Sequence, residues 1–135
     1  MTMLPIPPRG GVEHASTPPA ARLTLAQIDK SCAKACMVFI GSGVFWLICG
    51  SVLAMAASIK LHTPGFLDGA AWLTFGRVRP AHLNTMIYGW SAMSGAAVLL
   101  WIQARLSKAR LAAPRMVLVT AWLWNLGVAA GSIAI

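Results

Sequence analysis

Three apolar stretches, each long enough to cross a membrane, constrain this chain more than any other feature of its sequence. They cover residues 37–59, 81–106 and 116–135 of the 135-residue chain. A helix needs roughly 20 apolar residues to cross the hydrocarbon core of a bilayer. A segment surrounded by lipid must satisfy its own backbone hydrogen bonds, which a helix does. The sequence therefore predicts an all-α membrane protein with about three transmembrane helices.

The composition and the placement of charge favour a membrane protein over a nucleic-acid-binding one. Hydrophobic residues make up 58% of the chain and charged residues 10%, whereas about a quarter of a soluble domain is charged. The net charge of +8 is spread between the apolar stretches and is not gathered in one patch. Basic residues are fewer between the first two stretches than on either side of them. The positive-inside rule then predicts a cytoplasmic N-terminus and second loop, with the first loop outside.

The chain divides into a tail and a transmembrane region. Residues 1–23 are rich in proline and glycine and lack periodicity, which predicts a disordered tail. His14 lies in this tail and is expected to be solvated. Thr24 suits the N-cap of a helix, so residues 24–135 form the predicted transmembrane region, with a short lead-in before the first span.

The three cysteines indicate packing and not a framework of disulfides. Cys32, Cys36 and Cys49 are an odd number. Cys32 and Cys36 share one helix face, a spacing that can bind a metal, but no histidine follows at finger-like spacing. We therefore expect thiols that pack near the cytoplasmic end of the first helix.

The strongest candidate for chemistry is the stretch FGRVRPAH, residues 75–82, at the start of the second span. Pro80 suits the first position of a helix and disfavours helical backbone at Arg79. His82 is then predicted to lie in the first turn. The positive end of a helix disfavours imidazolium, so the ring is expected to be neutral and able to bind a metal.

The residues that follow His82 on the same helix face predict the shape of the space beside it. Thr85, Met86, Gly89 and Met93 follow His82 at helical spacing without a charge, which predicts a flat apolar slot. A porphyrin needs one axial nitrogen and such a space. The residues leave a second interpretation open, in which the histidine faces lipid headgroups and the nearby arginines bind lipid phosphates. His62 has no comparable face behind it.

The stretch FGRVRPAHLNTMIYGW resembles the second transmembrane helix of subunit I in cbb3-type cytochrome c oxidases, members of the haem–copper oxidase superfamily. The upstream run FWLICGSVLAMAASIKLHTPGFL resembles the first helix and outer loop of that subunit. This resemblance implies that the chain is the first part of a twelve-helix bundle. It also implies that His82 is an axial ligand of the low-spin haem b, and less strongly that Arg77 and Arg79 bind haem propionates.

The same resemblance implies a setting for the whole protein. The complete enzyme would receive electrons from cytochrome c, reduce oxygen to water at a high-spin haem b and copper, and translocate protons. Its partners would be the remaining helices of subunit I, the subunits that carry cytochrome c, and the lipid of a bacterial inner membrane. Nucleic acid is not among the expected partners.

Two features of the sequence keep alternatives open. No histidine follows His82, and the only tyrosine, Tyr88, lies too close to it to be the family's active-site tyrosine. The third apolar stretch runs to Ile135 without a polar cap, so we expect a fragment with no catalytic residue of its own. The alternatives are a relative of the nitric oxide reductase large subunit, a small b-type haem protein in which two copies pair, and an interaction protein without haem.

Overall fold

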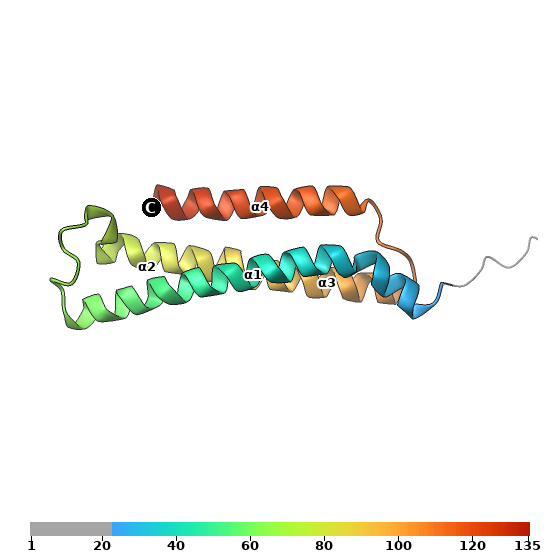
Figure 1. Cartoon of the computed structure of the whole chain (residues 1–135), viewed down its shortest axis with the longest axis horizontal. Coiled ribbons are helices and arrows are strands. Elements are labelled where there is room, and N and C mark those ends of the chain that lie inside the picture. Colours follow the sequence, from blue (N-terminus) through green and yellow to red (C-terminus); the bar gives the residue numbers. More distant parts are fainter. Residues whose placement is uncertain (1–22) are drawn as a thin grey trace, which may run out of the picture.

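The computed structural model describes residues 23–135, which form three long helices and no strand (Figure 1). Helix α1 spans Leu25–His62, and a single 3₁₀ turn, η1, spans Ala71–Leu73. The second long helix has three parts, α2 at Phe75–Asn84, a π-helix η2 at Thr85–Ser91 and α3 at Ala92–Ser107. The third, α4, spans Pro114–Ala134. All three are long and apolar enough to cross a membrane, which confirms the predicted fold class. The predicted tail, including His14, lies outside the described residues except for Leu23.

Helix α1 begins where the sequence predicted a cap, and it is longer than the first apolar stretch. The Thr24 hydroxyl accepts a hydrogen bond from the Gln27 backbone N–H at 3.3 Å, and the Gln27 side chain accepts one from the Thr24 N–H at 3.0 Å. This reciprocal capping box satisfies two backbone donors at the helix start. The lead-in and the span are therefore one continuous helix of 38 residues.

The predicted start of the second helix at Pro80 is wrong. The helix begins at Phe75, with Thr74 as its N-cap, and both Pro80 and Arg79 lie inside it. Proline lacks the N–H that would bond the carbonyl four residues earlier, here that of Gly76. Gly76 is exposed in the first turn, so its carbonyl can be satisfied by water or headgroups at the membrane boundary. His82 consequently lies two turns into the helix and not in its first turn.

Helix α1 packs along α2, η2 and α3 through glycines. A Cβ atom added to Gly89 would lie 2.5 Å from Cβ of Trp46, and one added to Gly43 would lie 2.7 Å from Oγ of Ser94. Real carbon atoms do not approach so closely, so these helices touch only because neither glycine has a side chain. Phe39 and Met93 are buried in a core cluster at this contact, near the middle of the bundle.

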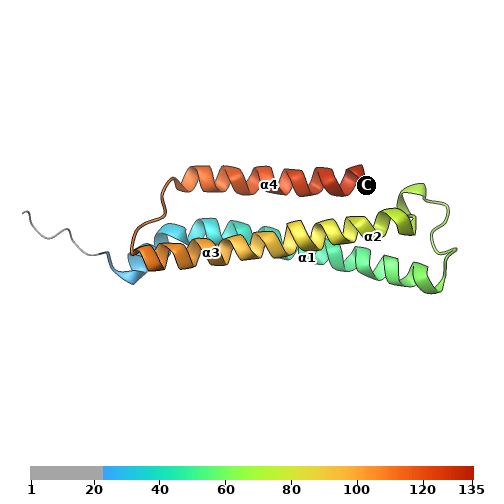
Figure 2. The ribbon, with the colours of Figure 1, turned by 180° about the vertical axis from the view of Figure 1, so that it is seen from behind.

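Helix α4 runs beside the other long helices (Figures 1 and 2). Polar side chains join it to them. The Trp46 indole N–H donates to Oδ1 of Asn125 at 2.7 Å, and the Asn125 amide donates to Ser42 at 3.1 Å. The amide of Asn84 donates to the Val128 carbonyl at 3.0 Å and to the Ser132 hydroxyl at 2.8 Å. Buried polar groups need such partners where water is absent, so these bonds orient α4 on the bundle.

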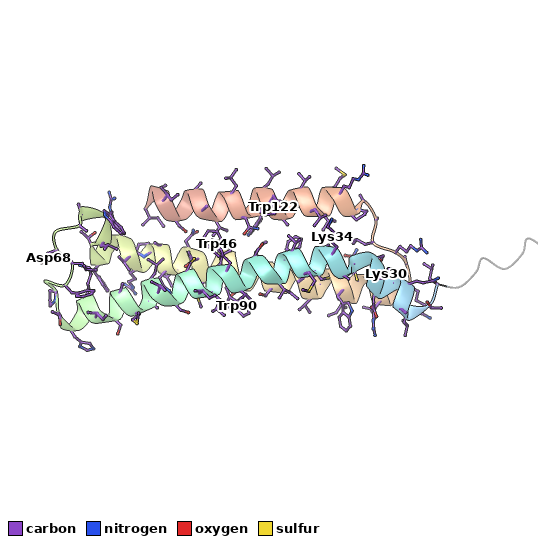
Figure 3. All side chains as sticks on the ribbon, in the orientation of Figure 1. Lys30, Lys34, Trp46, Asp68, Trp90 and Trp122 are labelled. Carbon is purple, nitrogen blue, oxygen red and sulfur yellow. The ribbon has the colours of Figure 1, made fainter. Side chains whose placement is uncertain are left out.

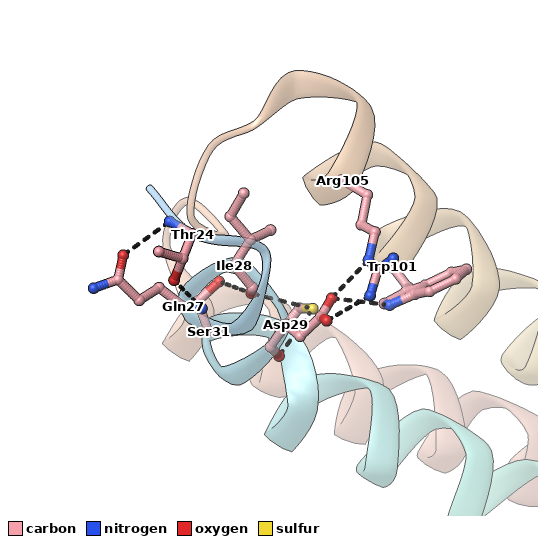
Figure 4. A network of polar contacts seen from close by, with 8 residues as sticks. Thr24, Gln27, Ile28, Asp29, Ser31, Trp101 and Arg105 are labelled. Atoms are coloured by element: carbon pink, nitrogen blue, oxygen red, sulfur yellow. Dashed lines mark hydrogen bonds and ion pairs between the residues drawn. The ribbon is translucent and has the colours of Figure 1, made fainter. Parts of the chain in front are cut away.

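Charged groups lie at the two ends of the bundle, as Lys30 and Asp68 illustrate in Figure 3. At one end Asp29 forms a two-bond ion pair with Arg105, at 2.9 and 2.6 Å, and accepts a bond from the Trp101 indole at 3.2 Å (Figure 4). At the other end the buried Lys60 ammonium donates to the Phe66 carbonyl and lies 3.8 Å from Asp68. The Asp29–Arg105 contact therefore joins α1 to α3 at one end, and the Lys60 contacts hold the loop that follows α1 at the other end.

Candidate functional site

His82 makes a hydrogen bond to the neighbouring helix that the sequence did not reveal. Its ring is half-buried, and Nδ1 lies 2.9 Å from the Gly50 carbonyl oxygen on α1. A carbonyl oxygen only accepts, so Nδ1 carries the proton and donates. Within residues 23–135 the ring makes no other hydrogen bond. Nε2 therefore has no hydrogen-bond partner among these residues, and it has a free lone pair whenever the ring is neutral, the arrangement of a metal-binding histidine whose other nitrogen is held by a second group.

The approach of His82 to α1 depends on Gly50. A Cβ atom at this position would lie 2.7 Å from Sδ of Met86 and 2.9 Å from Oγ1 of Thr85. Any larger residue would push the two helices apart and lengthen the bond from the imidazole. Gly50 therefore allows His82 to reach its bond on α1, in addition to the general role of small residues in the close packing of helices in a membrane.

The predicted flat slot below His82 is not open. Thr85, Gly89 and Met93 are buried, and the space that their small side chains leave is filled by α1, with Trp46 against Gly89. The stripe of small residues is the packing face of the helix pair. The chemistry of the site still fits a haem iron, because a neutral imidazole with a free nitrogen is what axial ligation requires. A haem held by Nε2 of His82 would therefore not occupy the predicted stripe, which α1 already covers.

The two candidate arginines, Arg77 and Arg79, lie in different surroundings. Both are exposed, and within the described residues neither forms an ion pair or a side-chain hydrogen bond. Arg79 precedes His82 by three residues and so shares its side of the helix. Arg77 instead lines a cavity of about 320 Å³ with Ala81 and Ile133, between α2 and the end of α4. Arg79 is therefore better placed than Arg77 to bind an anionic group next to the histidine.

A π-helix that was not predicted from the sequence begins at Thr85, one turn after His82. Its wide turns, at Thr85–Ser91, leave backbone carbonyls available to side chains. The Tyr88 carbonyl accepts a bond from the Trp124 indole at 2.9 Å, and the Met86 carbonyl accepts one from Ser91 at 3.0 Å. The Thr85 hydroxyl donates to the His82 carbonyl at 2.8 Å. Such π segments are rare and frequently mark functional sites. No residue pattern in this sequence predicted the segment.

The other candidate ligands lie apart from His82. His62 is exposed in the last turn of α1. Cys32, Cys36 and Cys49 are free thiols, and Cys36 donates to the Ala97 carbonyl at 3.5 Å across the contact of α1 with α3. No three histidine, cysteine or acidic side chains come together within residues 23–135 to hold a metal ion. Cys32 is buried, Cys36 and Cys49 are half-buried, and His82 is the one described histidine held by another helix.

Comparison with known proteins gives two bacterial relatives of this chain. It is 28% identical over 92 residues to the cbb3-type cytochrome c oxidase subunit CcoN1 of Stutzerimonas stutzeri, a match that covers 68% of this chain and 19% of that protein. It is 32% identical over 69 residues to the cytochrome c oxidase subunit 1 homolog of Azorhizobium caulinodans, covering 51% of this chain and 12% of that protein. The chain thus spans less than a fifth of the length of either relative. No solved structure matches it.

A family model gives the wider assignment. The model described as Cytochrome C and Quinol oxidase polypeptide I matches residues 34–135. The matched region begins inside α1 and includes His82, the π-helix and all of α4. Because the match extends over most of its length, this chain belongs to the cytochrome c and quinol oxidase polypeptide I family, the first subunit of the haem–copper oxidases.

Proposed function

We propose that this chain is the N-terminal portion of the catalytic subunit of a terminal respiratory oxidase. In that subunit His82 supplies one axial nitrogen to a low-spin haem b. The observation that carries the proposal is the bond from Nδ1 of His82 to the Gly50 carbonyl, which occupies Nδ1 and leaves Nε2 without a hydrogen-bond partner among the described residues. Family membership and the two oxidase relatives support the same assignment. The whole subunit would pass electrons from cytochrome c through this haem to a haem–copper centre that reduces oxygen to water.

Each residue at the site has a physical role in this proposal. A bound low-spin haem supplies reversible one-electron transfer. The Gly50 carbonyl fixes the His82 tautomer and ring orientation and makes Nε2 a stronger donor to a metal. The Thr85 hydroxyl bonds the His82 carbonyl and so steadies the turn that carries the ring. These contacts allow the ligand nitrogen to keep its position when the charge of the metal changes.

Arg79, and less directly Arg77, would hold the acidic edge of the macrocycle. A guanidinium pairs with a carboxylate through two parallel hydrogen bonds. Arg79 lies on the same side of the helix as His82, whereas Arg77 lines the cavity against α4. The second axial ligand, the high-spin haem b and the copper would be held by residues of the remaining helices. The relatives are five to eight times longer than the segment matched here, which leaves room for those helices.

The proposed setting is a bacterial inner membrane, with the N-terminus in the cytoplasm and His82 near the outer surface. Around the start of α1 and the α3–α4 loop, the described residues include six basic side chains and one acidic one, Asp29. The other end has only Lys60, Arg77 and Arg79 with Asp68. Cysteines introduced at Thr63 and Ser107 of a cysteine-free variant test this in intact cells. We expect a membrane-impermeant maleimide to label Thr63→Cys and not Ser107→Cys, and the reverse pattern would contradict the orientation.

A reduced-minus-oxidised spectrum tests the proposed function and separates it from the alternatives. We expect a low-spin b-type signal when the chain is produced within its complete reading frame and none when residues 1–135 are produced alone, because one chain offers one axial ligand. A haem signal from the short chain together with a dimer on size exclusion would identify the small dimeric haem protein instead. A folded complete protein without any haem signal would contradict the proposal. The copper or iron content of the complete protein distinguishes an oxidase from a nitric oxide reductase relative.

A further inference from the structure

A continuous groove runs between α3 and α4, from the α3–α4 loop toward the π-helix. It consists of three adjoining cavities of about 360, 340 and 400 Å³. Leu100 and Val117 line both the first and the second cavity, and Thr120 and Trp124 line both the second and the third. We call this space the α3–α4 groove. Its length follows the helices, so it extends into the membrane from the end of the bundle that carries Arg110.

The α3–α4 groove is cationic at one end and apolar along its length. Arg110 lines the first cavity, at the level of the loop. In the middle cavity the only polar side chain besides the Trp124 indole is Thr120, whose hydroxyl bonds the Met116 carbonyl at 3.0 Å. Asn84, at the far end, bonds Val128 and Ser132, and the indole bonds the Tyr88 carbonyl. Within residues 23–135 the guanidinium is the one charged group that lines the groove, and the Gln103 amide beside it in the same cavity likewise makes no side-chain hydrogen bond.

The loop that carries Arg110 is held in place by contacts with α1. The backbone N–H of Leu111 donates to the Ser31 hydroxyl at 3.1 Å. The Leu111 side chain packs against the buried cluster of Ile28, Cys32 and Ala104. Arg105, the nearby basic residue on α3, already pairs with Asp29. Among the described residues Arg110 has no ion pair, so its charge is available to a ligand at a defined place.

We propose that the α3–α4 groove binds an anionic phospholipid, with the phosphate at Arg110 and one acyl chain along the groove. A guanidinium matches the geometry of phosphate oxygens, and it lies here at the boundary between two membrane spans, where headgroups are found. An acyl chain in the bilayer is already surrounded by hydrocarbon, so its binding along the apolar walls relies on van der Waals packing and not on transfer out of water. An apolar neighbouring helix would fill the apolar part but would supply no anion, whereas a phospholipid supplies both an acyl chain and a phosphate that can pair with the exposed guanidinium. Charge complementarity therefore selects the lipid, independently of the haem proposal.

Native mass spectrometry of the full chain tests this binding. The chain is released from bilayer discs that contain phosphatidylglycerol and phosphatidylcholine in equal parts, and the lipids that remain bound are counted. We expect retention of one phosphatidylglycerol in preference to phosphatidylcholine. Arg110→Gln should weaken that binding about tenfold, because it removes charged hydrogen bonds to the phosphate. Arg115→Gln is the matched control, since Arg115 is an exposed arginine of the same end that lines none of the three cavities.

A second variant tests the acyl chain separately. Ala96 lines the middle cavity, so Ala96→Leu should lower retention of phosphatidylglycerol while the helical circular dichroism stays unchanged. Ala33→Leu, at an exposed position of α1, should have no effect. Equal losses for Arg110→Gln and Arg115→Gln, equal retention of the two lipids, or full retention by Ala96→Leu would each overturn the proposal. The absence of lipid from the groove of the protein produced in its complete reading frame would also overturn the proposal, because another helix would then occupy the groove.

Discussion

The variant His82→Ala is expected to lose the low-spin haem from the protein produced in its complete reading frame. The methyl group of alanine offers no lone pair, and the other described histidine, His62, is exposed at the far end of α1. Loss of a group that only supports a ligand already costs about 10- to 100-fold in metal affinity, so loss of the ligand itself should reduce bound haem by at least that much. Haem per protein, from the pyridine haemochrome spectrum, gives the measurement.

His62→Ala is the matched control for this experiment. It removes an imidazole from the same end of the bundle without touching the Gly50 contact, and it should retain the full amount of haem. Size exclusion and circular dichroism of both variants show whether the bundle remains folded, because loss of His82 also removes one bond to α1. A folded His82→Ala protein with normal haem content would place the axial ligand elsewhere in the subunit.

The variant Gly89→Ala is expected to destabilise the contact of α1 with η2 by about 1–3 kcal/mol, the usual cost of overpacking a tight core. The added methyl carbon would lie 2.5 Å from both Cβ and Cγ of Trp46. These atoms sit at the base of the tryptophan side chain and cannot swing aside as the end of a long chain can. Unfolding in mixed detergent micelles, followed by circular dichroism, measures the change in the free energy of unfolding.

Gly95→Ala is the matched control, in the same continuous helix. A Cβ atom at Gly95 meets nothing within 4 Å, and alanine in a helix is favoured over glycine by about 1 kcal/mol. This variant should therefore be neutral or slightly more stable. Equal effects of the two substitutions would mean that Gly89 does not lie against Trp46 as the structure has it.

The architecture was largely predictable from local properties of the sequence. Hydrophobicity and length predict a transmembrane helix without knowledge of its neighbours, so all three helices were expected. The Thr24 cap was predictable because it involves residues within one turn. The choice of His82 as a candidate also came from the sequence, through its place beside two arginines at the start of an apolar run, and its role as a haem ligand stays a prediction.

Two expectations from the sequence were wrong. Pro80 was expected to begin the second helix, but the helix begins at Phe75, and the one carbonyl that Pro80 cannot bond belongs to the exposed Gly76. The small residues below His82 were interpreted as space for a cofactor, yet Trp46 and Gly50 on α1 occupy that face. A glycine in a sequence indicates room for a close neighbour, and it does not say whether the neighbour is a helix or a ligand.

The sequence by itself determined that this chain forms helices long and apolar enough to span a membrane, where its charges lie and which histidine is the candidate ligand. These follow from residue type and spacing, which act within a single segment. Only the tertiary structure decided the partner of that histidine, the π-helix after it and the groove that ends at Arg110. Those features depend on which carbonyls and side chains of separate helices meet, and such meetings are set by the packing of all three helices together.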